Sequence, residues 1–210
     1  MGKIDPRVIK TRRKLKNAFL SLIATRKLSE INVKDLTQTA EVTRGTFYLH
    51  YKDKDTFIQV MMEGLIDEFF ESAIFEMKQE DKVYPVLSLI HVFDYVNDRP
   101  DFFTVLLKES DAIEYQNMFS NKLYHYIENY QVTSGIVSNS KVPKELLMNF
   151  LIYGVLGYID QWLKDGKIYA NRYMAENLEK LLTSELTSEA GLHGFFVTDE
   201  NDVINKLSNG

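Results

Sequence analysis

The stretch Ile31–Lys54, INVKDLTQTAEVTRGTFYLHYKDK, constrains the fold of this chain more than any other part of it. Asn32 has a side chain that can cap the N-terminus of a helix over Val33–Ala40. Thr43 can cap a second helix over Arg44–Tyr51 in the same way. Because few residues remain between the two helices, the sequence predicts a helix pair joined by a tight turn.

A further helix is expected before this pair. Asp5 is a favourable N-cap residue, and Pro6 fits the first helical position, where its missing N–H costs no hydrogen bond. The apolar residues that follow recur on one helical face as far as about Arg26. We therefore expect three short helices around a small core, forming an N-terminal head over residues 1–54.

The rest of the chain shows the period of helices and no strand-like alternation of any length. A long helix is expected over Lys54–Lys78, where apolar residues recur every four positions. Pro85 is expected to open a helix over Val86–Val96, and Pro143 is expected to open a later, longer one. The prediction is an all-α chain of about nine helices.

After the head, the predicted division of the chain is a helical regulatory and dimerisation body over residues 55–187 and a tail over residues 188–210. The tail begins with the apolar segment GLHGFFV and ends with a polar one. Three alternatives stay open for it: it packs on the body, it exchanges onto a second subunit, or it is disordered.

The helix that opens at Pro143 is predicted to be apolar on almost every side. Over Leu146–Ile159 only Asn149 is clearly polar, and a soluble helix of this kind has to be buried all round. The run is shorter than the ~20 residues that a membrane-spanning helix needs. It could be the central helix of a monomer. The favoured interpretation is a homodimer through helices near residues 143–187, since symmetric dimers are the commonest oligomers.

Charge is distributed unevenly along the chain. Its net charge is −5, yet residues 1–54 hold 13 Lys and Arg against 5 Asp and Glu, a balance of +8. The remainder holds 12 basic residues against 25 acidic ones, a balance of −13. A basic head on an acidic body indicates that only the head meets a polyanion, although some of these bases are ordinary solvated residues.

Composition indicates the compartment. The chain has no cysteine and no apolar leader near its first residue, and 45% of its residues are apolar. These features are typical of a soluble protein of the reducing cytoplasm with no membrane partner.

The second helix of the pair carries side chains that suit a DNA duplex. Thr43 lies where a phosphate could meet the helix N-terminus, and the fork of Arg44 matches the major-groove edge of guanine. Small residues next to Arg44 would let the helix lie deep in the groove. Taken singly, Tyr48 and His50 could be ordinary surface residues, so the prediction depends on the joint placement of the set. The predicted DNA-binding residues are Lys34, Thr43, Arg44, Gly45, Thr46, Tyr48, His50 and Lys54.

The stretch Val42–Lys54, VTRGTFYLHYKDK, resembles the signature of the tetracycline-repressor (TetR) family, V-x-x-[small]-T-[FLI]-Y-x-[HYF]-[FY]-x-x-K. The resemblance implies a homodimeric DNA-binding regulator whose last two long helices form a four-helix interface and whose body binds a small effector. It also implies two groups of contacts. Phosphates would be held by Thr43, Tyr48, His50 and Lys54, and bases approached by Arg44, Gly45 and Thr46.

Two further points qualify this resemblance. Glu41 stands in the turn where the family often has glycine, and a left-handed conformation there would cost ~1–2 kcal/mol. The body resembles the subgroup typified by the dihydroxyacetone-kinase regulator. The resemblance is carried by the segment Asp98–Leu107 and, later in the chain, by Trp162, Gly166, Met174, Leu178 and Leu181. Such a body could act through a partner protein.

An enzyme is the first rival hypothesis. Histidines are scattered without the spacing of metal ligands, at positions 50, 91, 125 and 193, and the chain has no glycine-rich phosphate loop or HExxH motif. We therefore expect no catalytic residues, no metal and no cofactor.

The expected function is a homodimeric transcription regulator that binds an operator in double-stranded DNA, a repressor released by a small effector. The alternative is a TetR-like co-regulator or adaptor that acts mainly through a protein partner. An effector cavity would be lined by aromatic and flexible residues of the body, although core packing explains each of them as well. These candidates are Phe93, Phe102, Phe103, Met118, Tyr126 and Trp162.

Overall fold

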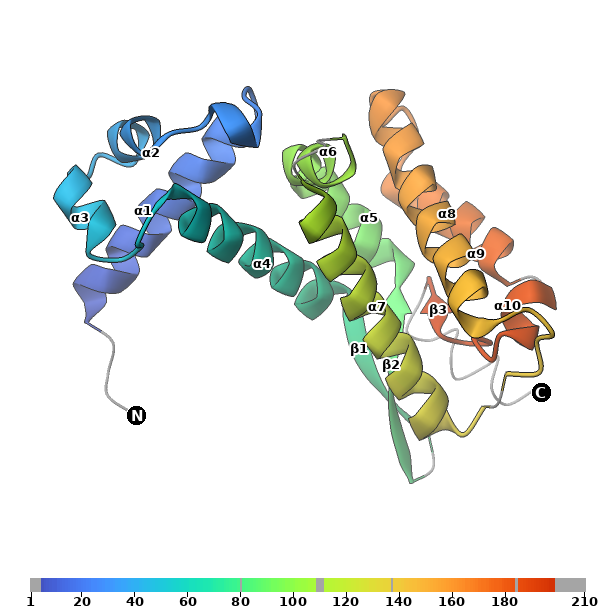
Figure 1. The fold of residues 1–210 in the computed structure, drawn as a ribbon. Helices are drawn as coiled ribbons and strands as arrows, with labels where there is room; N and C mark the ends of the chain where they lie inside the picture. Colours follow the sequence, from blue (N-terminus) through green and yellow to red (C-terminus); the bar gives the residue numbers. More distant parts are fainter. Residues whose placement is uncertain (1–4, 80, 109–111, 137, 184, 199–210) are drawn as a thin grey trace. The chain divides into compact units, whose positions relative to one another are not determined.

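The computed structural model describes residues 5–79, 81–108, 112–136, 138–183 and 185–198 (Figure 1). These residues form ten α-helices, one 3-10 helix and three short strands, which confirms the predicted all-α class and adds a small sheet to it. The chain divides into two compact units. The first contains residues up to 67 together with 101–116, and the second contains residues 68–100 together with those from 117 onward.

The first unit contains the predicted head. Its elements are α1 (Pro6–Ile23), η1 (Leu28–Glu30), α2 (Val33–Thr39), α3 (Arg44–Tyr48), the first part of α4 (Lys54–Ala73), α6 (Pro100–Lys108) and the start of α7 (Ile113–Ser134). The predicted start of α1 is confirmed, since the carboxylate of Asp5 accepts a hydrogen bond from the N–H of Arg7 at 2.8 Å and Pro6 follows it.

Phe57 of α4 lies at the centre of the aromatic core of the head. Its ring lies 5.8 Å from that of Phe19 in α1, 5.5 Å from that of Phe47 in α3 and 4.9 Å from that of Tyr51. The side chains of Phe19, Phe47 and Phe57 are fully buried. Since these rings come from three different helices, one cluster fixes how α3 is held on the head.

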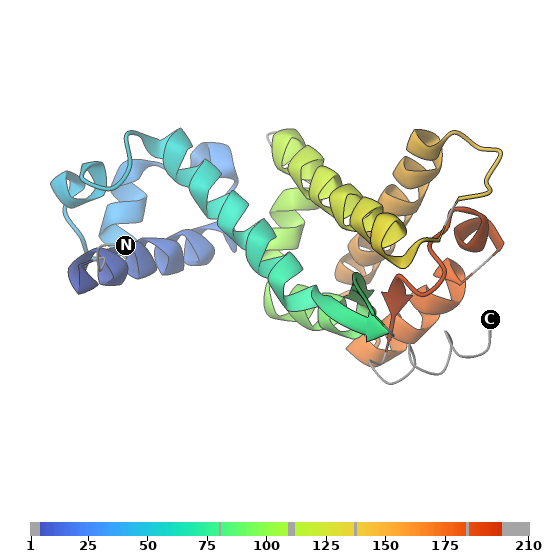
Figure 2. The same cartoon turned by 90° about the horizontal axis from the view of Figure 1, so that it is seen from below.

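The second unit combines helices with the small sheet. Its elements are the end of α4, β1 (Ile74–Gln79), β2 (Lys82–Ser88), α5 (Leu89–Asp98), most of α7, α8 (Lys144–Lys164), α9 (Asn171–Leu182), α10 (Glu185–Glu189) and β3 (Phe196–Val197). The strand order is β1-β2-β3, and Figure 2 shows β3 beside the hairpin of the first two.

Two helix predictions are wrong at this sheet. The long helix was expected to reach Lys78 but ends at Ala73, and β1 follows. Pro85 was expected to start a helix but lies in β2, opposite Glu76 of β1 in an antiparallel register. The helix begins only after Ser88, whose hydroxyl caps it. A recurrence of apolar residues every four positions also suits alternate strand positions, so only the distant pairing partner decides the element.

The first part of the predicted tail packs on the body. Phe195, Phe196 and Val197 are buried, and Leu87 of β2 pairs with Phe196 in parallel. The hydroxyl of Tyr130 in α7 donates to the carbonyl of His193, and burial raises the pKa of this tyrosine. The packing alternative therefore holds for residues 188–198, and residues 199–210 lie outside the described part of the chain.

The helix α8 is longer than the apolar run seen in the sequence. It has 21 residues and is the one helix, among the residues that the structure describes, long and apolar enough to cross a membrane by length and composition. The core helix of a soluble protein passes the same test. Eight of its side chains are buried, including Leu151, Ile159 and Trp162.

Candidate nucleic-acid interface

The turn between α2 and α3 is a Schellman motif that Glu41 closes in a left-handed conformation. The N–H of Val42 donates to the carbonyl of Thr37 at 3.0 Å, and the N–H of Glu41 donates to that of Gln38 at 3.2 Å. Glu41 has a φ of 52°, the region that favours glycine. The departure from glycine at this position therefore leaves the shape of the turn intact, at a cost of about 1–2 kcal/mol.

Both helices of the pair begin at the predicted N-caps. The hydroxyl of Thr43 accepts from the N–H of Thr46 at 3.0 Å, and their two hydroxyl oxygens are 2.8 Å apart. Asn32 and Asp35 form a reciprocal capping box, with distances of 3.1 and 3.3 Å. These caps stabilise two helices that are too short to persist alone.

The core contact of α3 decides which of its side chains face outward. Phe47 is fully buried and Tyr51 nearly so. Helical hydrogen bonds continue past the end of α3. The backbone N–H of Leu49 donates to the carbonyl of Gly45 at 3.1 Å, and the backbone N–H of Tyr51 donates to the carbonyl of Phe47 at 3.0 Å. With a rotation of about 100° per residue, Gly45 and Leu49 lie opposite the buried side.

The predicted residues of α3 lie at different positions around the helix. By the same rotation, Gly45 lies on the outward side, and Thr46 and Tyr48 lie on the flanks. Arg44 and His50 lie nearer the buried side of the helix, although the side chain of Arg44 is exposed. Tyr48 is 54% exposed, and its ring meets that of Phe47 edge to face at 5.4 Å. The structure therefore leaves Arg44, Gly45 and Tyr48 exposed, and it leaves Thr46 and His50 half-buried.

Leu49 is a residue of this surface that the sequence reasoning missed. It is 84% exposed and lies almost diametrically opposite Phe47. Two residues after an inward-facing position, a helical side chain points away from the core. That rotation is readable from the sequence once Phe47 is assigned to the core.

The two flanking lysines lie at other helix starts of the first unit. Lys34 is exposed in the first turn of α2, and Lys54 is the first residue of α4. Asp53, just before α4, accepts a hydrogen bond from the N–H of Thr56 at 2.8 Å, which holds the pKa of that carboxyl below its usual range. Lys54 also borders an open hollow of about 310 Å³, lined by Leu28, Ser29, Asp55, Ile58 and Tyr115.

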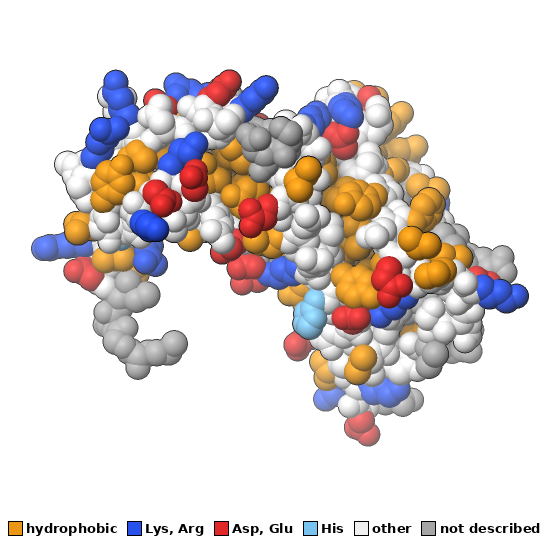
Figure 3. Space-filling view, viewed as in Figure 1, with side chains coloured by type: hydrophobic (Ala, Val, Ile, Leu, Met, Phe, Trp, Pro, Cys, Tyr) orange, Lys and Arg blue, Asp and Glu red, His pale blue; other side chains and the backbone are white. Residues whose placement is uncertain are grey.

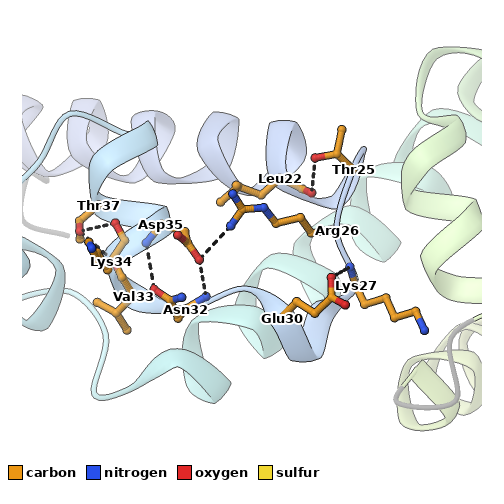
Figure 4. A network of polar contacts seen from close by, with 10 residues as sticks. All are labelled: Leu22, Thr25, Arg26, Lys27, Glu30, Asn32, Val33, Lys34, Asp35 and Thr37. Carbon is orange, nitrogen blue, oxygen red and sulfur yellow. Dashed lines mark hydrogen bonds and ion pairs between the residues drawn. The ribbon is translucent and has the colours of Figure 1, made fainter.

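A polar network ties α2 to the end of α1 (Figure 4). The guanidinium of Arg26 lies 3.0 Å from the carboxylate of Asp35, which also closes the capping box with Asn32. The hydroxyl of Thr37 donates back to the carbonyl of Val33 at 2.8 Å. Arg26 is therefore engaged within the protein, and its charge serves the packing of the head.

Other basic side chains of the head stand out in Figure 3 over the helices α1 to α3. Lys14 is paired with Glu41 at 3.4 Å, an exposed contact that water screens. Burial raises the pKa of Tyr51, and the nearby positive charge of Arg12 opposes that rise.

Core packing accounts for most of the candidate effector residues. Phe93 and Trp162 are buried and meet edge to face at 5.2 Å, and Phe102 meets Phe103 at 5.1 Å in the first unit. The ring of Tyr126 stacks on that of Phe70 at 5.3 Å. Among the described residues no group of three or more His, Asp or Glu side chains is arranged to hold a metal ion.

Helices α8 and α9 present an apolar face within the second unit. Phe150 of α8 is 68% exposed and Leu181 of α9 is 62% exposed. A groove of about 340 Å³ runs beside them, lined by Phe150, Leu151, Gly154, Val155, Tyr158, Leu178, Leu181 and Leu182. A Cβ atom at Gly154 or Gly157 would meet nothing within 4 Å. Among the residues that the structure describes, one side of α8 is therefore left facing solvent, and the expected burial all round would need a second subunit.

The C-terminal part of the chain matches a known family of regulators. Residues 86–184 match the TetR_C_8 family, which is described as "Transcriptional regulator C-terminal region". The chain is also 29% identical to the uncharacterized HTH-type transcriptional regulator YxbF of Bacillus subtilis (strain 168). That alignment extends over 146 residues and covers 59% of this chain and 38% of YxbF.

Solved structures share the fold over most of this chain. A TetR transcriptional regulator from Streptococcus agalactiae 2603V superimposes with a TM-score of 0.62 at 22% identity, covering 85% of this chain and 96% of that one. The dihydroxyacetone kinase operon activator DhaS superimposes with a TM-score of 0.57 at 16% identity, covering 85% of this chain and 97% of that one. The subgroup suggested by the sequence of the body is thus among the proteins of similar fold.

Proposed function

From the match of residues 86–184 to a TetR regulator model and the fold shared with TetR-family regulators, we propose that this chain is a TetR-family transcriptional regulator that binds an operator in double-stranded DNA as a homodimer and represses the adjoining genes in the cytoplasm. The observation that carries the proposal is the outward side of α3. Phe47 holds the helix on the head from one side, while Arg44, Gly45 and Tyr48 stay exposed and Thr46 is half-buried. A major groove admits a helix presented in this way.

The proposed contacts divide into positioning and reading. Thr43, Tyr48, His50 and Lys54, with Lys34, are proposed to hold phosphates and so to fix the register of the head on the duplex. Arg44 is proposed to donate to guanine, while Gly45 and Thr46 leave room for the approach of the helix. The positive balance of residues 1–54 supports this division, because phosphate contacts supply much of the affinity of DNA-binding proteins.

The second subunit is proposed to cover the apolar face of α8 and α9. Exposed side chains of this size on neighbouring helices are costly in water, and a twofold partner would bury them with its own copy of the same face. The glycines of α8 have open space above them, so a partner helix could approach closely. This proposal corresponds to a dimer interface within residues 143–187.

Release of the operator by a small effector bound in the body completes the proposal. No ligand class follows from the described residues, since the aromatic candidates pack against one another. The division into a DNA-binding domain, residues 1–54, and a regulatory and dimerisation domain, residues 55–187, is part of the same proposal.

Selection of bound sequences from random duplexes tests the proposal most directly. The purified protein is expected to enrich a twofold-symmetric motif, and its affinity for that motif should exceed its non-specific affinity by ~10³-fold or more. Sedimentation equilibrium should give twice the mass of the chain. The adaptor alternative makes the opposite prediction, namely no enriched motif and only weak attraction that vanishes with added salt.

A further inference from the structure

Leu49 has a position that neither core packing nor phosphate binding explains. The side chain is 84% exposed, although it belongs to one of the most apolar residue types. A single exposed leucine is common on protein surfaces and needs no explanation by itself. This one, however, directly follows α3 in the helical turn that continues it, and it lies almost opposite the buried Phe47.

The neighbours of Leu49 leave it unshielded. Gly45, one helical turn earlier on the same side, has no side chain, and a Cβ atom there would meet only the hydroxyl of Thr43, at 3.7 Å. The larger polar side chains of α3 lie on the flanks or nearer the buried side. A surface that approaches this helix along its outward side therefore meets the hydrocarbon of Leu49 first.

We propose that Leu49 reads the C5-methyl group of a thymine in the major groove of each half-site. The proposal rests on the proposed DNA-binding function and adds a specificity residue to it. A leucine side chain cannot donate or accept a hydrogen bond, so it gains nothing from phosphates or from the polar edges of bases. The thymine methyl is the apolar group that base edges present in the major groove, and the sugars lie at the margins of the groove.

The size of the expected effect follows from the burial of one methyl group. Removing a buried methyl from a duplex should weaken binding about 4-fold per half-site, and about 15-fold when both half-sites of a symmetric operator are changed. Such an effect is smaller than that of a lost bidentate hydrogen bond, yet well within the precision of a titration.

Deoxyuridine substitution tests the proposal, because deoxyuridine differs from thymidine only in lacking that methyl. Starting from the motif selected by the wild type, each thymine is replaced in turn in both half-sites, and Kd is measured for the wild type and for Leu49→Ala. The wild type should lose about 15-fold at one thymine position. Leu49→Ala should bind the thymine and uracil forms of that site equally well.

Two further variants serve as controls. Ile113→Ala removes another exposed apolar side chain of the first unit, 61% exposed, and should keep the full sensitivity to uracil. Leu49→Met keeps an apolar side chain at the same position, so this variant should keep most of the sensitivity to uracil. Thermal unfolding should confirm that each variant is folded, as expected for exposed positions.

The possible outcomes separate the inference from its premise. If the wild type selects a motif but tolerates uracil at every thymine, or if Leu49→Ala keeps the sensitivity of the wild type, Leu49 does not read a methyl group and the inference is overturned. If the wild type selects no sequence at all, the proposed function itself fails, and the role of Leu49 fails with it.

Discussion

At the scale of single residues, the head places a strained residue next to its proposed reading surface. Glu41 is held in the left-handed region, and two backbone hydrogen bonds of the turn maintain it there. A glycine would adopt the same conformation without steric cost. The turn geometry is thus set by the packing of α2 and α3, and the residue in it tolerates the strain.

Glu41→Gly is expected to stabilise the protein by about 0.5–1 kcal/mol. Relief of the left-handed strain, ~1–2 kcal/mol, is partly offset by the greater backbone entropy of glycine in the unfolded chain. The midpoint of urea unfolding at constant slope measures this change. Glu41→Ala is the matched control, because it removes the charge and keeps the strain, and it should bring no gain. A destabilised glycine variant would contradict the account of the turn.

Arg44 and Lys54 are expected to differ in what their loss does to DNA binding. Arg44→Ala should relax the preference at one base pair by ~1–3 kcal/mol, because a bidentate contact to guanine discriminates between bases. Lys54→Ala, like His50→Ala, should weaken all duplexes alike and lower the dependence on salt by about one phosphate contact. Titrations of matched and mismatched duplexes at several salt concentrations separate the two effects. If Arg44→Ala bound every sequence with the affinity of the wild type, Arg44 would have no reading role.

At the scale of elements, α8 has apolar side chains both on its buried side and on its exposed side. Its buried residues include Leu147, Ile152 and Trp162, while Phe150 and Tyr153 point to solvent. A helix that is apolar on both sides is expected to have a protein partner on each. Within the part of the chain that the structure describes, one of those sides is covered and the other is not.

Phe150→Asp is expected to dissociate the proposed homodimer. A carboxylate in the middle of an apolar interface would appear twice in a symmetric dimer, once from each subunit, and each copy would be buried without a partner. Sedimentation equilibrium of the variant should give the mass of one chain at concentrations at which the wild type is dimeric. Val132→Asp, at a position on α7 that is 81% exposed, is the control and should leave the mass unchanged. A dimeric Phe150→Asp variant would exclude this face as the interface.

At the scale of the whole molecule, the proposed function requires two heads to engage one duplex together. Half-sites for a twofold pair of recognition helices lie about 34–36 Å apart, one turn of DNA, or a multiple of it. The affinity of the pair then exceeds that of one head because the second binding event is intramolecular.

Insertion of half a helical turn between the selected half-sites is expected to reduce affinity to that of a single half-site. Such an insertion rotates one half-site to the opposite face of the duplex, so both heads cannot bind at once. Fluorescence anisotropy with the native, the half-turn and the full-turn spacing measures the effect. Equal affinity for all three duplexes would mean that the heads bind independently, which contradicts the proposed arrangement.

Local features of the sequence determined much of this structure. The caps at Asp5, Asn32 and Thr43 depend on hydrogen bonds to residues two or three positions away, so they could be predicted and are confirmed. The helices of the body could likewise be predicted, because the recurrence of apolar residues on one helical face is a local feature of the sequence. Apart from Lys34, the set of residues proposed to meet DNA follows from a motif of thirteen consecutive residues, VTRGTFYLHYKDK, and their roles stay predictions.

The tertiary structure decided what depends on distant partners. The stretch from Ile74 is a strand because β2 lies beside it, and β2 in turn pairs with Phe196, more than a hundred residues along the chain. Only the packed chain shows that the described residues leave one apolar side of α8 uncovered, because burial is a property of neighbours in space and not of the sequence around a residue.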